Sequence, residues 1–270
     1  MPQAQTNGIT MSYEITGRGP AVMLIGGLGS DGHFWYKQTP ALAGRFLVIM
    51  PDNRGAGRTQ APDEPYTIRM MAADSAGLLD ALKIPTAHIV GASMGGFIAQ
   101  EFALAYPERV GRLVLCCTAF GGPRSIPIPV AALPPRTGDP RLDLRAAFEM
   151  QLSSDYLRAH ARELDDYIAW RVAHPQPLHA YHRQAAAVVA HDTEARLGTL
   201  RLPVLILHGD RDNVIPAGNA QLMAGRIPGA RVHMFPGAGH LFLWECMDDT
   251  NRLITEFLSA HTPDSEEGAS

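Results

Sequence analysis

Short apolar runs alternate with longer stretches in which apolar residues recur every three to four positions, from residue 9 to residue 118. A short apolar run is typical of a strand buried on both faces of a sheet, and the longer repeat is typical of an amphipathic helix. Strand followed by helix in this rhythm predicts an α/β fold with a doubly wound, mostly parallel sheet. The predicted strands span residues 9–15, 21–25, 46–50, 87–90 and 113–117, and the predicted helices span residues 68–82 and 94–106.

The alternation stops after residue 118. Six of the residues between 121 and 140 are proline, which excludes a long regular element in that segment. Residues 142–200 have a helical pattern without a strand pattern, and Ser153 or Ser154 is the expected N-cap of one helix. This block predicts a helical cap inserted after the sixth strand of the sheet.

Strands and helices resume after the cap. The predicted strands span residues 203–207 and 232–235, and the predicted helices span residues 217–227 and 241–258. The last nine residues are polar and acidic, as expected of a frayed terminus. We therefore expect one core made of residues 1–119 and 201–261, a helical cap of residues 120–200, and a flexible tail of residues 262–270.

Composition and charge exclude several classes of protein. Hydrophobic residues make up 46% of the 270 residues and charged residues 19%, which excludes a disordered chain. The 23 Lys and Arg against 27 Asp and Glu give a net charge of −4 without a basic run, so nucleic acid is not an expected partner. No apolar stretch approaches the ~18 residues needed to span a membrane.

The cysteines and the N-terminus bear on localisation. Three cysteines are too few for a disulfide framework, and the first residues contain neither a positive start nor an apolar run. These features favour a cytoplasmic protein. The pattern leaves the oligomeric state open, a homo-oligomer included.

Residues 91–95 read Gly-Ala-Ser-Met-Gly, which matches the pattern G-x-S-x-G. Chance alone gives roughly 0.1 matches in a chain of this composition, so the context has to decide its meaning. The motif follows a predicted strand and precedes a predicted helix, where a sharp turn exposes the serine hydroxyl and the helix N-terminus favours negative charge beside it. An ordinary N-cap serine is the alternative interpretation. We predict that Ser93 is a nucleophile.

A serine hydroxyl needs a base to remove its proton, and the base needs a carboxylate to orient it. His240 lies in a loop between the strand at 232–235 and the last helix, and Asp212 follows the strand at 203–207. Ser93, Asp212 and His240 thus all follow strands, at the sheet edge where open α/β sheets bind their ligands. Asp210 is the alternative acid.

These motifs resemble those of the α/β-hydrolase fold family, over nearly the whole chain apart from the cap and the tail. The resemblance implies a triad of Ser93, Asp212 and His240, and the family spacing favours Asp212 over Asp210. It also implies an oxyanion hole formed by the backbone N–H groups of Met94 and Leu28. The loop that carries Leu28 has Gly26 where many members of the family have histidine.

The resemblance implies a cofactor-independent serine hydrolase that cleaves a carboxylic ester or lactone of a small to medium, largely apolar molecule. The same triad also serves carbon–carbon bond hydrolases and cofactor-free perhydrolases or haloperoxidases, and a ligand receptor built on a hydrolase scaffold is a third hypothesis. Because ligand pockets are largely apolar, we expect these residues to line the substrate pocket: Gly27, His33, Trp35, Phe120, Trp170 and Trp244.

The remaining polar motifs have simpler interpretations. Residues 52–58 resemble a glycine-rich turn of the family, to which we assign a structural role. His174, His179 and His182 lack a cysteine or carboxylate that would complete a zinc site, so no metal is expected. His208 is expected to pack behind the turn that carries Asp212.

Overall fold

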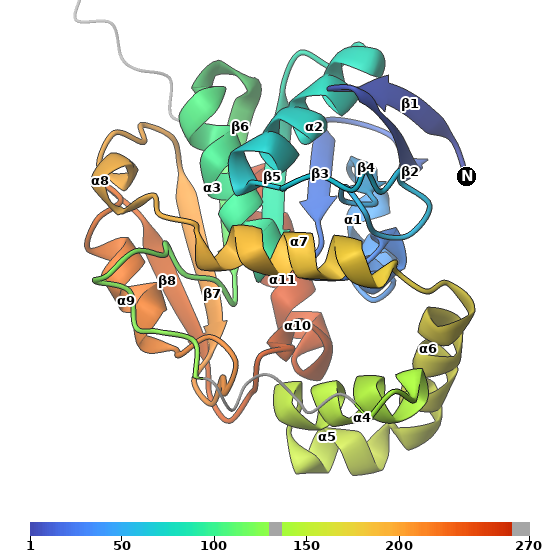
Figure 1. The fold of residues 1–270 in the computed structure, drawn as a ribbon. Helices are drawn as coiled ribbons and strands as arrows, with labels where there is room; N and C mark the ends of the chain where they lie inside the picture. Colours follow the sequence, from blue (N-terminus) through green and yellow to red (C-terminus); the bar gives the residue numbers. More distant parts are fainter. Residues whose placement is uncertain (130–136, 261–270) are drawn as a thin grey trace, which may run out of the picture.

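The computed structural model describes residues 1–129 and 137–260, so the predicted tail at 262–270 lies outside the described residues. An eight-stranded sheet forms the centre of the fold, in the order β1-β2-β4-β3-β5-β6-β7-β8 (Figure 1). The strands are β1 (Gln3–Thr6), β2 (Ile9–Gly17), β3 (Ala21–Ile25), β4 (Leu47–Pro51), β5 (Ala87–Ala92), β6 (Val110–Cys116), β7 (Val204–Gly209) and β8 (Arg231–Phe235).

Most neighbouring strands in this sheet are parallel. The pairs β1–β2 and β2–β4 are antiparallel, and every pair from β4 through β3 to β8 is parallel. The prediction of a mostly parallel α/β sheet is therefore confirmed. The short polar edge strand β1 was not predicted from the sequence.

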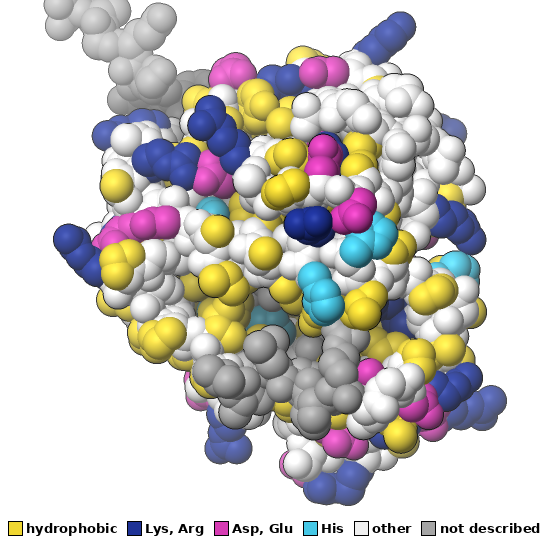
Figure 2. Space-filling view, in the orientation of Figure 1, with side chains coloured by type: hydrophobic (Ala, Val, Ile, Leu, Met, Phe, Trp, Pro, Cys, Tyr) yellow, Lys and Arg dark blue, Asp and Glu magenta, His cyan; other side chains and the backbone are white. Residues whose placement is uncertain are grey.

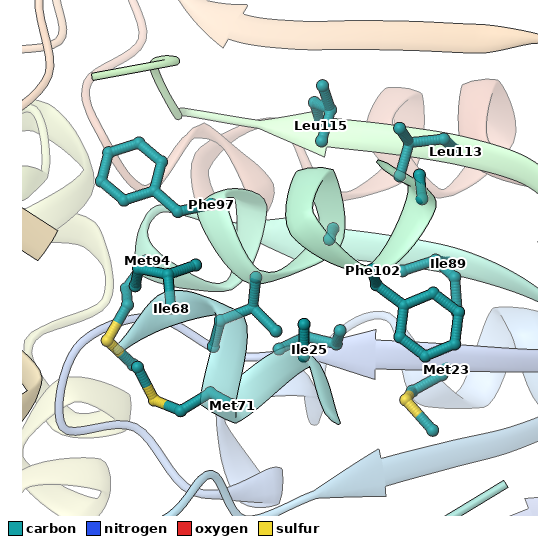
Figure 3. Close-up of a cluster of buried hydrophobic side chains, with 14 of the residues drawn as sticks. Met23, Ile25, Ile68, Met71, Ile89, Met94, Phe97, Phe102, Leu113 and Leu115 are labelled. Atoms are coloured by element: carbon teal, nitrogen blue, oxygen red, sulfur yellow. The ribbon is translucent and has the colours of Figure 1, made fainter. Parts of the chain in front are cut away.

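The parallel strands β3 to β7 are buried on both faces, which explains their continuous apolar runs. Successive side chains of a strand point to opposite faces. In β3, Met23 and Ile25 belong to one apolar cluster, and Val22 and Leu24 belong to another. Figure 3 shows the first cluster, where Met23 and Ile25 lie beside Phe102 and other side chains of the helices that cover this face.

Helices cover both faces of the sheet. The cluster in Figure 3 includes side chains of α2 (Ile68–Ala81) and α3 (Met94–Ala105), whereas the opposite cluster includes side chains of α1 (Thr39–Ala43) and α11 (Met247–Ser259). The other core helices are η1 (Gly32–Trp35), η2 (Pro107–Arg109), α9 (Gly218–Ala224) and α10 (Phe242–Glu245).

Between β6 and β7 the described residues form helices and no strand. They are α4 (Pro140–Gln151), α5 (Ser154–Ala159), α6 (Ala161–Ala173), α7 (Leu178–Val189) and α8 (Glu194–Leu197). The Ser153 hydroxyl accepts a hydrogen bond from the Tyr156 N–H, which makes Ser153 the N-cap of α5. Figure 1 shows α4, α5 and α6 grouped beyond the sheet and α7 crossing in front of it.

Two further features of the structure concern membrane-spanning helices and the distribution of positive charge. No helix within residues 1–129 and 137–260 is long and apolar enough to cross a bilayer. On the face shown in Figure 2, Lys and Arg side chains are separated by acidic and apolar ones. Positive charge on that face is therefore not gathered into one patch.

One buried imidazole makes the stability of this fold depend on pH. His191 is buried, its ring stacks on Phe97 with centroids 4.7 Å apart, and burial lowers its pKa to about 4. Between about pH 6.5, the ordinary histidine pKa, and about pH 4, the His191 imidazole is protonated in the unfolded chain and neutral in the folded protein. The free energy of unfolding therefore falls as the pH falls from about 6.5 to 4.

We expect His191→Gln to remove this pH dependence, which amounts to a loss on the order of 3 kcal/mol between pH 7 and pH 4. Urea unfolding at several pH values measures it for both proteins. The difference in unfolding free energy between wild type and variant should shrink with acidification. If the unfolding free energies of wild type and variant ran parallel with pH, His191 would not be the source of this pH dependence.

Candidate active site

Ser93 lies in the sharp turn between β5 and α3. Its φ of 55° is in the left-handed region, which is strained for a residue with a side chain. The Ser93 N–H donates to the Cys116 carbonyl at 2.9 Å, and the Thr118 hydroxyl donates to the Ser93 carbonyl at 2.9 Å. The end of β6 therefore holds both peptide groups of this residue in place.

The two glycines of the motif allow the turn to pack against its neighbours. A Cβ on Gly91 would lie 2.2 Å from the Gly95 carbonyl oxygen, and a Cβ on Gly95 would lie 2.0 Å from the Ile25 carbonyl oxygen. Both contacts are with backbone atoms, which cannot rotate away as a side chain can. Only glycine fits at positions 91 and 95.

Gly95→Ala is therefore expected to destabilise the protein by at least about 3 kcal/mol, because the added methyl group overpacks the turn against β3. Thermal unfolding followed by circular dichroism measures the effect. Gly225→Ala is the matched control, because Gly225 has a φ of −65° and a Cβ there would meet no atom closer than 3.6 Å. A similar melting temperature for the two variants would contradict this account of the turn.

Asp212 and His240 form a buried acid–base pair after β7 and β8. The Asp212 Oδ2 lies 2.7 Å from His240 Nδ1, and its Oδ1 accepts the N–H groups of Val214 and Ile215, each at 2.8 Å. Burial favours the neutral carboxyl, but the His240 and His208 imidazoles outweigh it and hold the pKa of Asp212 well below its usual range. Asp212 is therefore ionised at neutral pH.

An ionised Asp212 fixes the tautomer of its partner. A carboxylate only accepts hydrogen bonds, so the His240 Nδ1 carries the hydrogen and donates it. The His240 Nε2 then has a free lone pair. A histidine oriented in this way can take a proton from a hydroxyl at Nε2.

His208 also contacts the carboxylate. Its Nε2 lies 3.0 Å from the Asp212 Oδ2 and 2.9 Å from the Ile215 carbonyl oxygen, and both of these atoms are acceptors. The His208 Nε2 is therefore a donor. His208 was expected to pack behind this turn, but its hydrogen bond to the acid was not predicted from the sequence.

Ser93 lies at the same edge of the sheet as this pair. It follows β5, whereas Asp212 and His240 follow β7 and β8, and β6 lies between β5 and β7 in the sheet. The end of β6 joins the two sides, because the Cys116 carbonyl accepts the Ser93 N–H at 2.9 Å and the Cys117 N–H donates to the Leu207 carbonyl of β7 at 2.9 Å. Burial and the nearby Cys116 and Asp212 raise the pKa of the Cys117 thiol, and a hydrogen bond with the Ser93 backbone lowers it. The Ser93 side chain is partly exposed, and its hydroxyl makes no hydrogen bond to His240 or to any other described residue.

The loop after β3, residues 26–30, lies against Ser93; we call it the oxyanion loop. A Cβ on Gly27 would lie 3.2 Å from the Ser93 Cβ and 3.7 Å from its Oγ. The Ser30 N–H donates to the Gly27 carbonyl at 3.1 Å and closes the loop into a tight turn. Among the described residues, the N–H groups of Leu28 and Met94 have no hydrogen-bond acceptor, so both can bind an oxyanion.

Three of the residues expected in the substrate pocket are buried. Trp35 and Phe120 are fully buried in the apolar core, and Trp244 is 3% exposed, with its ring centroid 4.8 Å from that of Tyr167. A large apolar residue near a strand end can pack into the core as readily as it can line a cavity, so a place for these three in the substrate pocket stays a prediction. Gly27 borders Ser93.

His33 and Trp170 line a cavity of about 550 Å³ between η1 and α6, with their ring centroids 4.5 Å apart. The other lining residues that carry polar or aromatic groups are Tyr36, His160, Arg162, Glu163, Asp166 and Tyr167. The Glu163 carboxylate accepts the Tyr36 hydroxyl at 2.7 Å and pairs with the Lys37 ammonium at 2.6 Å. This cavity is therefore lined by both aromatic rings and charged side chains.

Comparison with known proteins identifies the family. Residues 20–245 match the family profile described as the alpha/beta hydrolase fold. The chain is 31% identical over 260 residues to a protein of Azorhizobium caulinodans provisionally named carbamate hydrolase RutD, with 95% of this chain and 98% of that protein aligned. It is 30% identical over 259 residues to 2-hydroxy-6-oxo-6-phenylhexa-2,4-dienoate hydrolase of Burkholderia cepacia, with 90% and 89% aligned.

The solved structures agree. The enol-lactonase of Burkholderia xenovorans LB400 superposes with a TM-score of 0.85 at 28% identity, over 96% of this chain and 100% of that one. The family profile covers most of the core strands described above, including the turn that carries Ser93 and the loop that carries His240. The chain belongs to the α/β-hydrolase fold family.

Proposed function

We propose that this hydrolase cleaves a carboxylic ester or lactone, of small to medium size and largely apolar, through an acyl-enzyme on Ser93. The observation that carries the proposal is the buried Asp212–His240 pair, joined at 2.7 Å, at the sheet edge where the strained turn presents Ser93. A serine, an oriented imidazole and two unpartnered N–H groups are the groups that acyl transfer requires.

The first half of the proposed reaction forms the acyl-enzyme. The Ser93 Oγ attacks the carbonyl carbon while the His240 Nε2 takes the hydroxyl proton, and the carbonyl electron pair moves onto oxygen. The N–H groups of Leu28 and Met94 hold this oxyanion, each contributing about 3 kcal/mol. The tetrahedral intermediate then collapses, and the leaving alkoxide takes the proton from His240.

The second half regenerates the enzyme. Water attacks the acyl carbon while His240 takes one of its protons, and Ser93 leaves with that proton when the acid is released. Asp212 keeps the imidazole in the required tautomer throughout and stabilises the imidazolium that forms twice. No step in this scheme needs a group beyond the chain, the substrate and water.

Carbon–carbon bond cleavage is the second candidate, and the likeness to the dienoate hydrolase of Burkholderia cepacia supports it. The triad alone does not separate the two, because the same nucleophile and base serve both reactions. The likeness to the enol-lactonase supports the ester or lactone. Substrate preference therefore has to be measured.

A substrate panel decides between these candidates. We expect kcat/KM for p-nitrophenyl butyrate or a γ-lactone to exceed that for a vinylogous 1,5-diketone or an N-alkyl carbamate by about 100-fold, a difference of roughly 3 kcal/mol in transition-state binding. A reversed order would assign a carbon–carbon or carbamate hydrolase. Peroxide-dependent turnover of acetate would instead assign a perhydrolase.

A fluorophosphonate probe separates an inactive protein from a poor substrate choice. The probe should attach to Ser93 in the wild type, because it needs only the nucleophile, the base and the oxyanion donors. Labelling without turnover of any panel member would mean that the substrate class is wrong. Tight ligand binding with neither labelling nor turnover would favour a receptor.

A further inference from the structure

The oxyanion loop is held by side chains from two helices of the cap. The Gly29 N–H donates to the Gln184 Oε1 of α7 at 3.0 Å, and the Arg171 guanidinium of α6 donates to the Gly29 carbonyl. The Trp170 indole donates to the Asp31 Oδ2 at 3.3 Å, directly after the loop. Both peptide groups of Gly29 are thus bonded to the cap, and α7 lies next to the end of β3 (Figure 1).

Gln184 is fully buried, and both ends of its amide are used. Its Nε2 donates to the Arg54 carbonyl at 2.8 Å, while its Oε1 accepts the Gly29 N–H. Since Gly29 offers a donor and Arg54 an acceptor, only one orientation of the amide satisfies both. One side chain of the cap therefore joins the loop after β3 to the turn after β4.

This contact adjoins the atom that would bind the oxyanion. The Gly29 N–H belongs to the peptide group that follows Leu28, one residue along the chain from the Leu28 N–H, so a bond that fixes Gly29 limits how far the backbone at Leu28 can move. Gly29 has a φ of +71°, and a Cβ there would lie 2.9 Å from the Gln176 Oε1, so the loop packs closely against the segment that joins α6 to α7. Oxyanion donors work only when held within a few tenths of an ångström of their target.

We propose that Gln184 is a positioning residue, through which the docked cap holds the oxyanion loop so that the Leu28 N–H points at the reacting carbonyl. The proposal rests on the proposed serine hydrolase function. On this proposal the cap contributes to catalysis, because the oxyanion loop loses the Gln184 hydrogen bond when α7 moves away from it.

Gln184→Met tests the proposal, since methionine keeps the length and volume of glutamine and loses both hydrogen bonds. We expect kcat for p-nitrophenyl butyrate, per active site titrated by the fluorophosphonate burst, to fall about 10- to 100-fold, with KM within about twofold. Phosphonylation should slow in parallel, because its transition state also carries charge on the oxygen.

Gln38→Met is the matched control. Gln38 is also fully buried, and its Nε2 donates to the Leu243 carbonyl at 2.7 Å, away from the oxyanion loop. We expect its kcat to stay within about twofold of the wild type, whatever the loss of stability. A merely structural role for Gln184 would lower the melting temperature of both variants and leave kcat per titrated site unchanged in both, which would overturn the proposal.

Two further measurements extend this comparison: the first uses a different variant, and the second does not need turnover. Arg171→Leu changes a partly exposed side chain, releases the Gly29 carbonyl, and should lower kcat by a smaller factor of about five. Hydrogen exchange of the segment 26–31 should be faster in Gln184→Met than in Gln38→Met. Equal exchange in the two would contradict the positioning role even if no substrate had been found, whereas a wild type that turns over nothing would count against the function alone.

Discussion

Replacing Ser93 with alanine is expected to lower kcat for ester hydrolysis by about 10⁵- to 10⁶-fold, the loss seen when the nucleophile of a serine hydrolase is removed. No other hydroxyl stands in the turn between β5 and α3 beside the oxyanion loop. The N–H groups of Leu28 and Met94 stay in place in the variant. A residual rate above the uncatalysed reaction is therefore expected, with KM little changed.

The Ser93→Ala protein should remain folded. The Ser93 side chain makes no capping hydrogen bond, and the bonds of its backbone to Cys116 and Thr118 do not involve the hydroxyl. Near-ultraviolet circular dichroism and the melting temperature check this. Ser75→Ala is the control, because the Ser75 hydroxyl is buried in α2 and donates only to the Met71 carbonyl at 3.1 Å. A Ser93→Ala protein that kept more than about 1% of the wild-type rate would exclude the acyl-enzyme on this residue.

The strands that can be predicted from the sequence are those whose burial requires apolar residues. Strands β3 to β7 are covered on both faces, so most positions along them favour an apolar residue, and the runs are visible without a structure. The edge strand β1 reads Gln-Ala-Gln-Thr and is held by pairing with β2. Backbone pairing imposes no apolar pattern on an exposed edge, so β1 could not be found this way.

The acid–base pair was predictable for a related reason. Parallel strands bring their carboxyl ends to one edge, so residues after β7 and β8 meet there whatever their distance in the chain. Asp212 and His240 were expected at this edge and are hydrogen-bonded at 2.7 Å. The prediction that Ser93 acts as their partner in catalysis rests on its place at the same edge.

The surroundings of the site follow from packing that the sequence does not display. Trp35 and Phe120 are of residue types common in ligand pockets, but they are buried in the core. Gln184 stands in no recognisable motif, and yet it binds the oxyanion loop, 155 positions away in the chain. Which helix of the cap lies on which loop depends on tertiary contacts. No local periodicity contains that information.

Asp212→Asn is expected to lower kcat by about 10⁴-fold at neutral pH. The asparagine Oδ1 can still accept the N–H groups of Val214 and Ile215, which leaves an amide NH₂ facing His240. His240 then has to accept at Nδ1 and carry its hydrogen at Nε2, the atom that should remove the hydroxyl proton. The geometry is retained, but the base is lost.

Asp210→Asn is the matched control for this loss, and it also tests the alternative acid. Asp210 is exposed, and its Oδ1 accepts the Gly237 N–H at 2.7 Å, a bond that an amide oxygen can also accept. We therefore expect kcat for Asp210→Asn to stay within about twofold of the wild type, because only a neutral hydrogen bond replaces an exposed ionic one. Steady-state rates for both variants, normalised to titrated sites, decide the assignment. A greater loss of kcat at position 210 than at position 212 would assign the role of the acid to Asp210. Equal, small losses would mean that His240 does not need a carboxylate to act as the base.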